Sequence, residues 1–397
     1  MIRAELRPSA AAAGVAAFLV LGSVQALVSV AWIVLVLVAA QLAWRGAIDL
    51  DRPLDAIERA GGVWLAVMVI AALAGIAPRQ SLLMSVPVLS VLILWCLLVR
   101  VELKPVDARW LALGLALAAL CQFAMVARQV LLNPHALPAA WIADSDTPWL
   151  VVPNDIAWFG AALPLLAASC GRYERLAGWS LLVLSLAACV LLQSRTAALV
   201  AGGSFVIYLW LCRSKGRIPW RAVGVLAVMA LLVLPLLVIY VPSFTSRWQL
   251  WMAAVQVFAT HPLLGVGPHN FATAAQPWLA SLPDRVDPRV APWPHNLLLE
   301  IAAETGLAGL VCAAWFGLGV VRRIGCNLVQ GCHRIHYAAF AGLGGLAIAS
   351  LVEASLLRVW VWHLGVVLLG LVLMPVSLWS SFPAFSDGRG DSPGIET

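Results

Sequence analysis

Charged residues are scarce in this 397-residue chain: only 11% are Asp, Glu, Lys or Arg, whereas 62% are hydrophobic. A soluble globular protein carries about 25% charged and roughly 45–50% apolar residues. This shortage of charge excludes a water-soluble enzyme, a disordered chain and a protein that binds nucleic acid. The mean hydropathy of +0.94 instead predicts a membrane protein with several spans, because each span needs about 20 apolar residues.

The sequence also lacks a CxxC pair, and no cysteine falls in a long polar loop. Most of its eight cysteines lie within apolar runs, where a thiol behaves as a small hydrophobic group. They stand at positions 96, 121, 170, 189, 212, 312, 326 and 332. We therefore expect neither a disulfide framework nor a metal site.

Apolar runs predict an all-α integral membrane protein with about twelve transmembrane helices. The expected spans are 9–23, 25–44, 61–77, 81–99, 110–127, 153–170, 176–193, 197–212, 222–241, 296–320, 335–352 and 359–380. Spans one to nine thus occupy residues 1–241, a large loop occupies 242–295, and the last three spans occupy 296–380. The polar tail, 381–397, is expected to be disordered.

Positive charges are divided unevenly between the two sides of this map. With the N-terminus inside, 18 of the 25 Lys and Arg residues fall on the cytoplasmic side and 7 on the other. This bias predicts that both termini are cytoplasmic and that the large loop is periplasmic. The seven residues on the far side are Arg79, Arg128, Arg195, Arg247, Arg285, Arg289 and Arg358.

The large loop is rich in Pro, Trp, His and Arg, and it contains a segment with helical spacing, RWQLWMAAVQVFA at 247–259. Its apolar side would carry Trp248, Trp251, Val255 and Phe258. We expect an amphipathic helix along the outer leaflet. The next segment, HPLLGVGPHNF at 261–271, is dense in glycine and proline, which predicts successive turns. As a phosphate loop it is weak, because no Lys follows GVG.

Three residues on the far side are the strongest candidates for chemistry. Arg195 lies between two apolar runs, where a charge is costly without a partner; it is either functional or snorkels to the headgroups. Arg247 opens the proposed surface helix and suits either a phosphate or a lipid headgroup. His295 stands at the mouth of the tenth span, where it either exchanges a proton or is a plain interfacial residue. Asn296 after it can cap the helix.

These strings together resemble one family. His295-Asn296 followed by Gly306 and Gly309 resembles the histidine motif of bacterial O-antigen ligases. The string from Arg195 to Leu199 resembles that family's arginine motif, and residues 246–271 resemble its large periplasmic loop. The three occur in the family's order, and the resemblance covers about 190–310.

The resemblance implies a membrane glycosyltransferase. Such a ligase transfers a glycan from undecaprenyl diphosphate to lipid A–core oligosaccharide at the periplasmic face of the bacterial inner membrane. Because the donor is already activated, no nucleotide, metal or other cofactor is expected. The partners are the lipid-linked donor, the lipid A–core acceptor and membrane lipids.

The resemblance also implies roles for individual residues. Arg195 and Arg247 would bind the diphosphate, since a guanidinium matches phosphate oxygens. His295 would accept the proton of the attacking hydroxyl, with inversion at the anomeric carbon. Weaker candidates for binding phosphate or sugar are Arg285, Arg289, His269, Asn270, Asn296 and Arg128. No role is assigned to Asn154, Asp155, Glu300 or Glu304.

Two other functions remain open. An O-antigen polymerase shares much of the same signature, although the roughly 54-residue loop suits the ligase better. A secondary transporter with twelve spans is an alternative of another class. It predicts structural repeats and interrupted midplane helices, neither of which is clear in this sequence.

Overall fold

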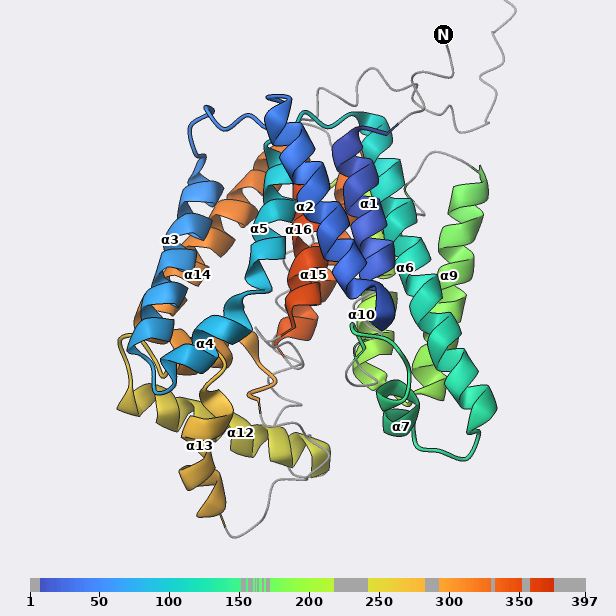
Figure 1. Ribbon diagram of the computed structural model, residues 1–397. Coiled ribbons are helices and arrows are strands. Elements are labelled where there is room, and N and C mark those ends of the chain that lie inside the picture. The colour runs from blue at the N-terminus through green and yellow to red at the C-terminus, as the bar shows by residue number, and fades with distance from the viewer. Residues whose placement is uncertain are drawn as a thin grey trace, which may run out of the picture.

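The apolar segments form helices that run side by side in one bundle (Figure 1). The computed structural model describes residues 8–150, 155, 160, 162, 164, 165, 168, 172–217, 242–282, 293–329, 333–351 and 358–374. Within these residues, every regular element is a helix. The prediction of an all-α protein is therefore confirmed for the described part of the chain.

The long helices follow the predicted apolar runs closely. They are α1 (Ala10–Gly22), α2 (Val28–Trp44), α3 (Ala56–Ala74), α5 (Val88–Val99), α6 (Pro105–Leu132), α9 (Arg172–Leu191), α10 (Arg195–Ser214), α14 (Leu297–Val329), α15 (Arg334–Ser350) and α16 (Val359–Leu373). The other helices are η1 (Gln25–Leu27), α4 (Pro78–Ser85), α7 (Pro138–Ala143), α12 (Pro242–Thr260) and α13 (Phe271–Ala280).

Six helical segments of the described chain are long and apolar enough to cross a membrane. They are Gln25–Trp44, Ala56–Ala74, Pro78–Val99, Pro105–Leu132, Arg195–Ser214 and Leu297–Leu328. These segments support a membrane protein, whereas the number of twelve spans stays a prediction. The predicted span 222–241, most of 153–170 and the tail 381–397 lie outside the described residues.

Local chemistry explains where helices begin and end. Asp55 starts α3 with a capping box, in which its carboxylate accepts the N–H of Glu58 and the Glu58 carboxylate accepts the N–H of Asp55. Helix α6 is longer than the predicted span 110–127 at both of its ends. Pro105 suits a first helical position, and nothing breaks the helix before the Asn133-Pro134 pair.

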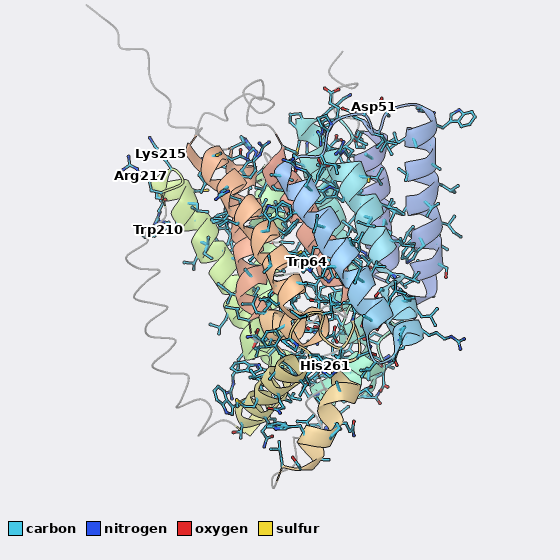
Figure 2. All side chains as sticks on the ribbon, turned by 90° about the vertical axis from the view of Figure 1, so that its left-hand side faces the viewer. Asp51, Trp64, Trp210, Lys215, Arg217 and His261 are labelled. Atoms are coloured by element: carbon cyan, nitrogen blue, oxygen red, sulfur yellow. The ribbon has the colours of Figure 1, made fainter. Side chains whose placement is uncertain are left out.

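The two ends of the bundle differ in what they carry. At one end, here called the loop end, lie α7, α12 and α13 (Figure 1), and His261 (Figure 2). Asp51, Lys215 and Arg217 lie at the opposite end (Figure 2). The segregation agrees with the uneven charge distribution in the sequence. It places the large loop and the Lys/Arg-rich turns on different sides of the bundle.

Candidate functional site

Helix α14 is interrupted close to its start, at Gly306, which has φ +66° and ψ −160°. This region of backbone space is essentially restricted to glycine. The break leaves backbone groups unpaired within the helix, and the loop between α12 and α13 supplies their partners. The hydrogen bonds run from the N–H of Val266 to Ala303 O (3.0 Å), Gly267 to Glu304 O (2.9 Å), Leu307 to Pro262 O (2.7 Å) and Ala308 to Leu263 O (3.1 Å).

Two glycines allow the loop and the broken helix to approach this closely. A Cβ atom on Gly306 would lie 2.4 Å from the backbone carbon of Leu263, and one on Gly265 would lie 2.3 Å from that of Glu304. Neither distance is sterically allowed, so only glycine fits either position. The segment 261–270 is therefore a set of turns docked on α14, as its glycine and proline content predicts.

Glu304, two residues before the break at Gly306, connects α14 to the start of α13. Its fully buried carboxylate accepts the N–H of Phe271, the first residue of α13, at 3.2 Å, and the backbone N–H groups of His269 and Asn270 also face it. Glu304 had no predicted role, and the structure gives it this capping contact.

Asn270 and His269, both predicted to bind substrate, lie in this docked loop. Asn270 is fully buried, and its Nδ2 donates to Ser81 Oγ and to Val266 O, each at 2.9 Å. Burial lowers the pKa of His269 to about 4, so this imidazole is neutral at pH 7. The contacts of Asn270 hold the loop against α4, and binding of phosphate or sugar by either residue stays a prediction.

His269 also borders an apolar cavity of about 400 Å³ between α3 and α5. Aromatic rings of Trp64, Trp95, Phe316 and Trp362 line the wall of this cavity. Its lining continues along α3 to Glu58 and Arg100, near the opposite end of the bundle. The cavity thus extends along the length of α3.

Arg247 lies within α12, and here one expectation about local structure is wrong. The helix begins at Pro242 instead of at Arg247. Proline suits the first turn of a helix, so residues 242–246 form the start of α12. Arg247 is therefore in the second turn, beyond the free N–H groups of a helix start. Arg247 as a whole is half-buried.

The buried side of α12 also differs from the tryptophan side. Leu250, Ala253, Ala254 and Val257 are buried in a cluster with residues of α13 and α14. By contrast, Trp248 is 41% exposed and Val255 46%. The packing of α12 onto α13 and α14 therefore leaves Trp248 and Val255 of the predicted apolar side exposed, whereas Trp251 and Phe258 are half-buried. The position of this helix along a membrane surface stays a prediction.

Arg195 is the first residue of α10 and its side chain is exposed. Ser194 precedes it as the N-cap, accepting the N–H of Ala197 at 3.2 Å. The cap explains why the helix starts here, directly after the turn at Gln193. A guanidinium and the positive end of a helix therefore stand together, a combination that favours anions.

His295 is only 4% exposed and has a positive φ of 51°. A non-glycine residue in this region is uncommon and persists only when its surroundings hold it there. Asn296 follows as the cap of α14: its Oδ1 accepts the N–H of Leu299 at 3.1 Å, and its Nδ2 donates to Leu351 O at 3.0 Å. The predicted cap is confirmed, while substrate binding by Asn296 stays a prediction.

A chain of contacts that the sequence did not suggest leads away from His295. The rings of Trp293 and His295 lie 5.2 Å apart, and the Arg358 guanidinium lies 4.9 Å from the centre of the Trp293 ring. Arg358 in turn makes a buried ion pair with Asp155. The two charged residues are 203 positions apart, so no local pattern connects them. The sequence offered one indication of such a pair: both charges lie at the mouths of predicted spans, where an unpaired charge is costly.

The remaining candidates are less informative. Arg128 is exposed near the end of α6, and Glu300 is fully buried in the first turn of α14. Arg285, Arg289 and Asn154 lie outside the described residues. Among the residues that the structure describes, no three His, Cys, Asp or Glu side chains gather in a group able to hold a metal ion.

Comparison with known proteins finds a family match within this chain. Residues 180–314 match the family model described as O-antigen ligase. No curated protein matches the chain. The family match confirms the resemblance to O-antigen ligases over the part of the chain that carries its motifs. Arg195, Arg247 and His295 all fall inside the matched residues.

Proposed function

We propose that this protein is an O-antigen ligase, a membrane enzyme that transfers a glycan from undecaprenyl diphosphate to lipid A–core oligosaccharide. The observation that carries the proposal is the family match over 180–314, which contains both candidate arginines and the candidate histidine. Helix α12, which contains Arg247, lies at the loop end of the bundle (Figure 1). The first turns of α14, which follow His295, bond to the loop between α12 and α13. The loop end would face the periplasm.

In this reaction, a hydroxyl oxygen of the acceptor sugar attacks the anomeric carbon of the donor glycan. The bond from that carbon to the diphosphate oxygen breaks, and undecaprenyl diphosphate leaves with the bonding electrons. His295 takes the proton of the attacking hydroxyl as general base. Arg195 and Arg247 stabilise the negative charge that grows on the leaving diphosphate. A single displacement inverts the configuration of the anomeric carbon.

The orientation rests on the charge distribution. Lys215 and Arg217 stand at the end opposite to His261 (Figure 2), and positively charged loops favour the cytoplasm. The loop end, with α12 and α13, then lies in the periplasm. Both termini would be cytoplasmic, and the lipid-linked donor would reach the site from the outer leaflet.

Reconstitution tests the proposal directly. The purified protein is placed in liposomes with undecaprenyl-diphosphate glycan and lipid A–core, without ATP and in the presence of EDTA. We expect lipid A–core to gain the mass of the donor glycan. No transfer by well-folded protein would contradict the proposal. Elongation of the lipid-linked glycan in the absence of lipid A–core would instead identify a polymerase.

A further inference from the structure

His295 is fixed from one side by an aromatic and ionic assembly that lies outside the predicted site. Trp293, two residues before it, contacts the imidazole ring at a centroid distance of 5.2 Å with the planes inclined by 37°. Because His295 adopts a positive φ, its local backbone is strained and needs support from tertiary contacts. The contact with the Trp293 ring contributes to this support.

Trp293 is itself held by a charge. The Arg358 guanidinium lies over its ring at 4.9 Å, which is within the range of a cation–π contact. Arg358 is 5% exposed and Asp155 is fully buried, so their ion pair is shielded from water. A buried, paired guanidinium has few alternative positions. The Arg358 guanidinium therefore restricts the orientation of the Trp293 ring.

A second aromatic contact stabilises the same corner. Trp360, in the first turn of α16, stacks on Trp149 with ring planes only 8° apart and centroids 6.2 Å apart. Both rings are buried. The stack anchors the start of α16, and with it Arg358, to the segment after α7. The position of Arg358 is therefore determined by two independent contacts, one ionic and one aromatic.

We propose that Arg358 is a positioning residue for His295, acting through Trp293 and held in place by Asp155. The inference rests on the proposed function, since His295 is the general base of that reaction. The base must stand within hydrogen-bond reach of the acceptor hydroxyl, and small displacements of a base cost much of the rate. Arg358 touches neither donor nor acceptor in this assignment.

The variants are chosen to avoid leaving a lone buried charge. Arg358→Gln combined with Asp155→Asn neutralises both partners and removes the cation from the Trp293 ring. Trp293→Ala removes the ring, whereas Trp293→Phe keeps an aromatic plane. The matched control is Arg100→Gln combined with Glu58→Gln, which neutralises another buried pair near the opposite end.

The first measurement does not depend on activity. In protein labelled with ¹³C at histidine Cε1, only seven histidines contribute signals, and His295→Gln identifies the signal of His295. We expect that signal to shift or broaden in the neutralised Arg358/Asp155 pair and in Trp293→Ala. It should stay near its wild-type position in Trp293→Phe and in the control pair. An unchanged His295 signal in the Arg358/Asp155 variant would overturn the proposal.

The second measurement is glycan transfer per folded protein. Neutralising the Arg358/Asp155 pair should lower kcat on the order of 10²-fold, with KM for the donor unchanged, and Trp293→Phe should restore most of the loss seen in Trp293→Ala. Adding the neutralised pair to Trp293→Ala should cost nothing more, because one chain of contacts is broken only once. Additive losses, or a normal kcat, would refute the positioning role. If wild-type protein transfers nothing, the proposed function fails while the histidine signal still decides the positioning.

Discussion

The bundle has a buried arginine–carboxylate pair near each end. The two pairs differ in how many guanidinium nitrogens donate a hydrogen bond to the protein. Arg100 donates from Nε to Glu58 Oε1 at 2.6 Å and from Nη2 to Glu58 Oε2 at 2.9 Å. Its Nη1 donates to the carbonyl oxygens of Asp49, at 3.1 Å, and Arg52. Each of its three nitrogens therefore donates to a protein oxygen.

Arg358 is used differently. Its Nη1 pairs with Asp155, but its Nη2 is buried and has no hydrogen-bond partner among the residues that the structure describes. The guanidinium lies instead over Trp293, beside His295. Buried polar groups are normally hydrogen-bonded, and in the described part of the chain the Arg358 guanidinium departs from this rule while that of Arg100 follows it. Arg100 thus joins α3 to the end of α5, while Arg358 contacts Trp293, which lies against His295, in keeping with the proposed positioning role.

The largest effect should come from His295 itself. His295→Gln removes the proposed general base and should lower transfer on the order of 10²–10⁴-fold. His261→Gln is the matched control: this histidine lies at the same end and is exposed (Figure 2), and it should leave transfer unchanged. Equal transfer rates for the two variants in the reconstituted assay would show that His295 is not the general base.

Breaking the pair near the opposite end should affect stability alone. Arg100→Gln leaves the Glu58 carboxylate buried with a weakened partner set, at a cost of roughly 3–5 kcal/mol. The loss should fall at the lower end of that range, because Arg52 also lies 3.7 Å from Glu58. The midpoint of denaturant unfolding measures it. Transfer per folded molecule should equal that of wild type, and a lower value would erase the contrast between the two arginines.

A smaller change tests the docked loop at α14. Gly306→Ala forces a side chain onto a glycine-only backbone conformation, a strain on the order of 1–3 kcal/mol, and its Cβ meets the Leu263 backbone. Gly317→Ala lies in the same helix, where nothing stands within 4 Å of an added Cβ. It should be neutral or slightly stabilising, since alanine favours helices. Thermal unfolding of the two variants should differ accordingly, and equal melting temperatures would show that the break at Gly306 is dispensable.

The smallest effect concerns pH, again with one residue at each end. Burial lowers the pKa of His269, at the loop end, and of His333, at the opposite end, to about 4 from an ordinary value of 6.5. Both are neutral in the folded protein, whereas the unfolded chain binds protons below pH 6.5. Their stability contribution is therefore complete above pH 6.5 and is lost as the pH falls toward 4.

Single variants separate the two ends. His269→Gln and His333→Asn, the latter retaining a capping side chain, should each flatten the dependence of melting temperature on pH between 6.5 and 4. The double variant should show the flattest dependence. A slope identical to that of wild type in either single variant would show that the histidine in question remains accessible to protons in the folded state.

Much of the fold was predictable from the sequence. The run from Arg195 to Ser214 and the run that starts at Leu297 form helices where their apolar residues indicate them, and Asn296 caps α14 as expected. Helix positions follow from local composition and spacing, because the backbone N–H and C=O groups of a long apolar run must form hydrogen bonds with one another when the run lies in lipid. The predicted start of α12, Arg247, was wrong by five residues. Proline and serine before it are typical both of a turn and of the first turn of a helix, so the residue types did not distinguish the two.

The candidate site was predictable only in part. His295 was recognised from its motif, but the residues that surround it were not, because Asp155 and Arg358 come from distant parts of the chain. Glu304 had no predicted role, because its contact depends on the start of α13 lying against it. Gly306 was part of a motif, and its spacing gave no indication that α14 breaks there.

The sequence by itself determined the membrane character, the helical segments and the unequal charge of the two sides, since these depend on how many apolar and charged groups each stretch must place in lipid or water. Only the tertiary structure decided which carboxylate each buried arginine meets, which glycine interrupts α14, and which ring contacts His295. These outcomes depend on packing between segments far apart in the chain, and no local preference encodes which distant group arrives.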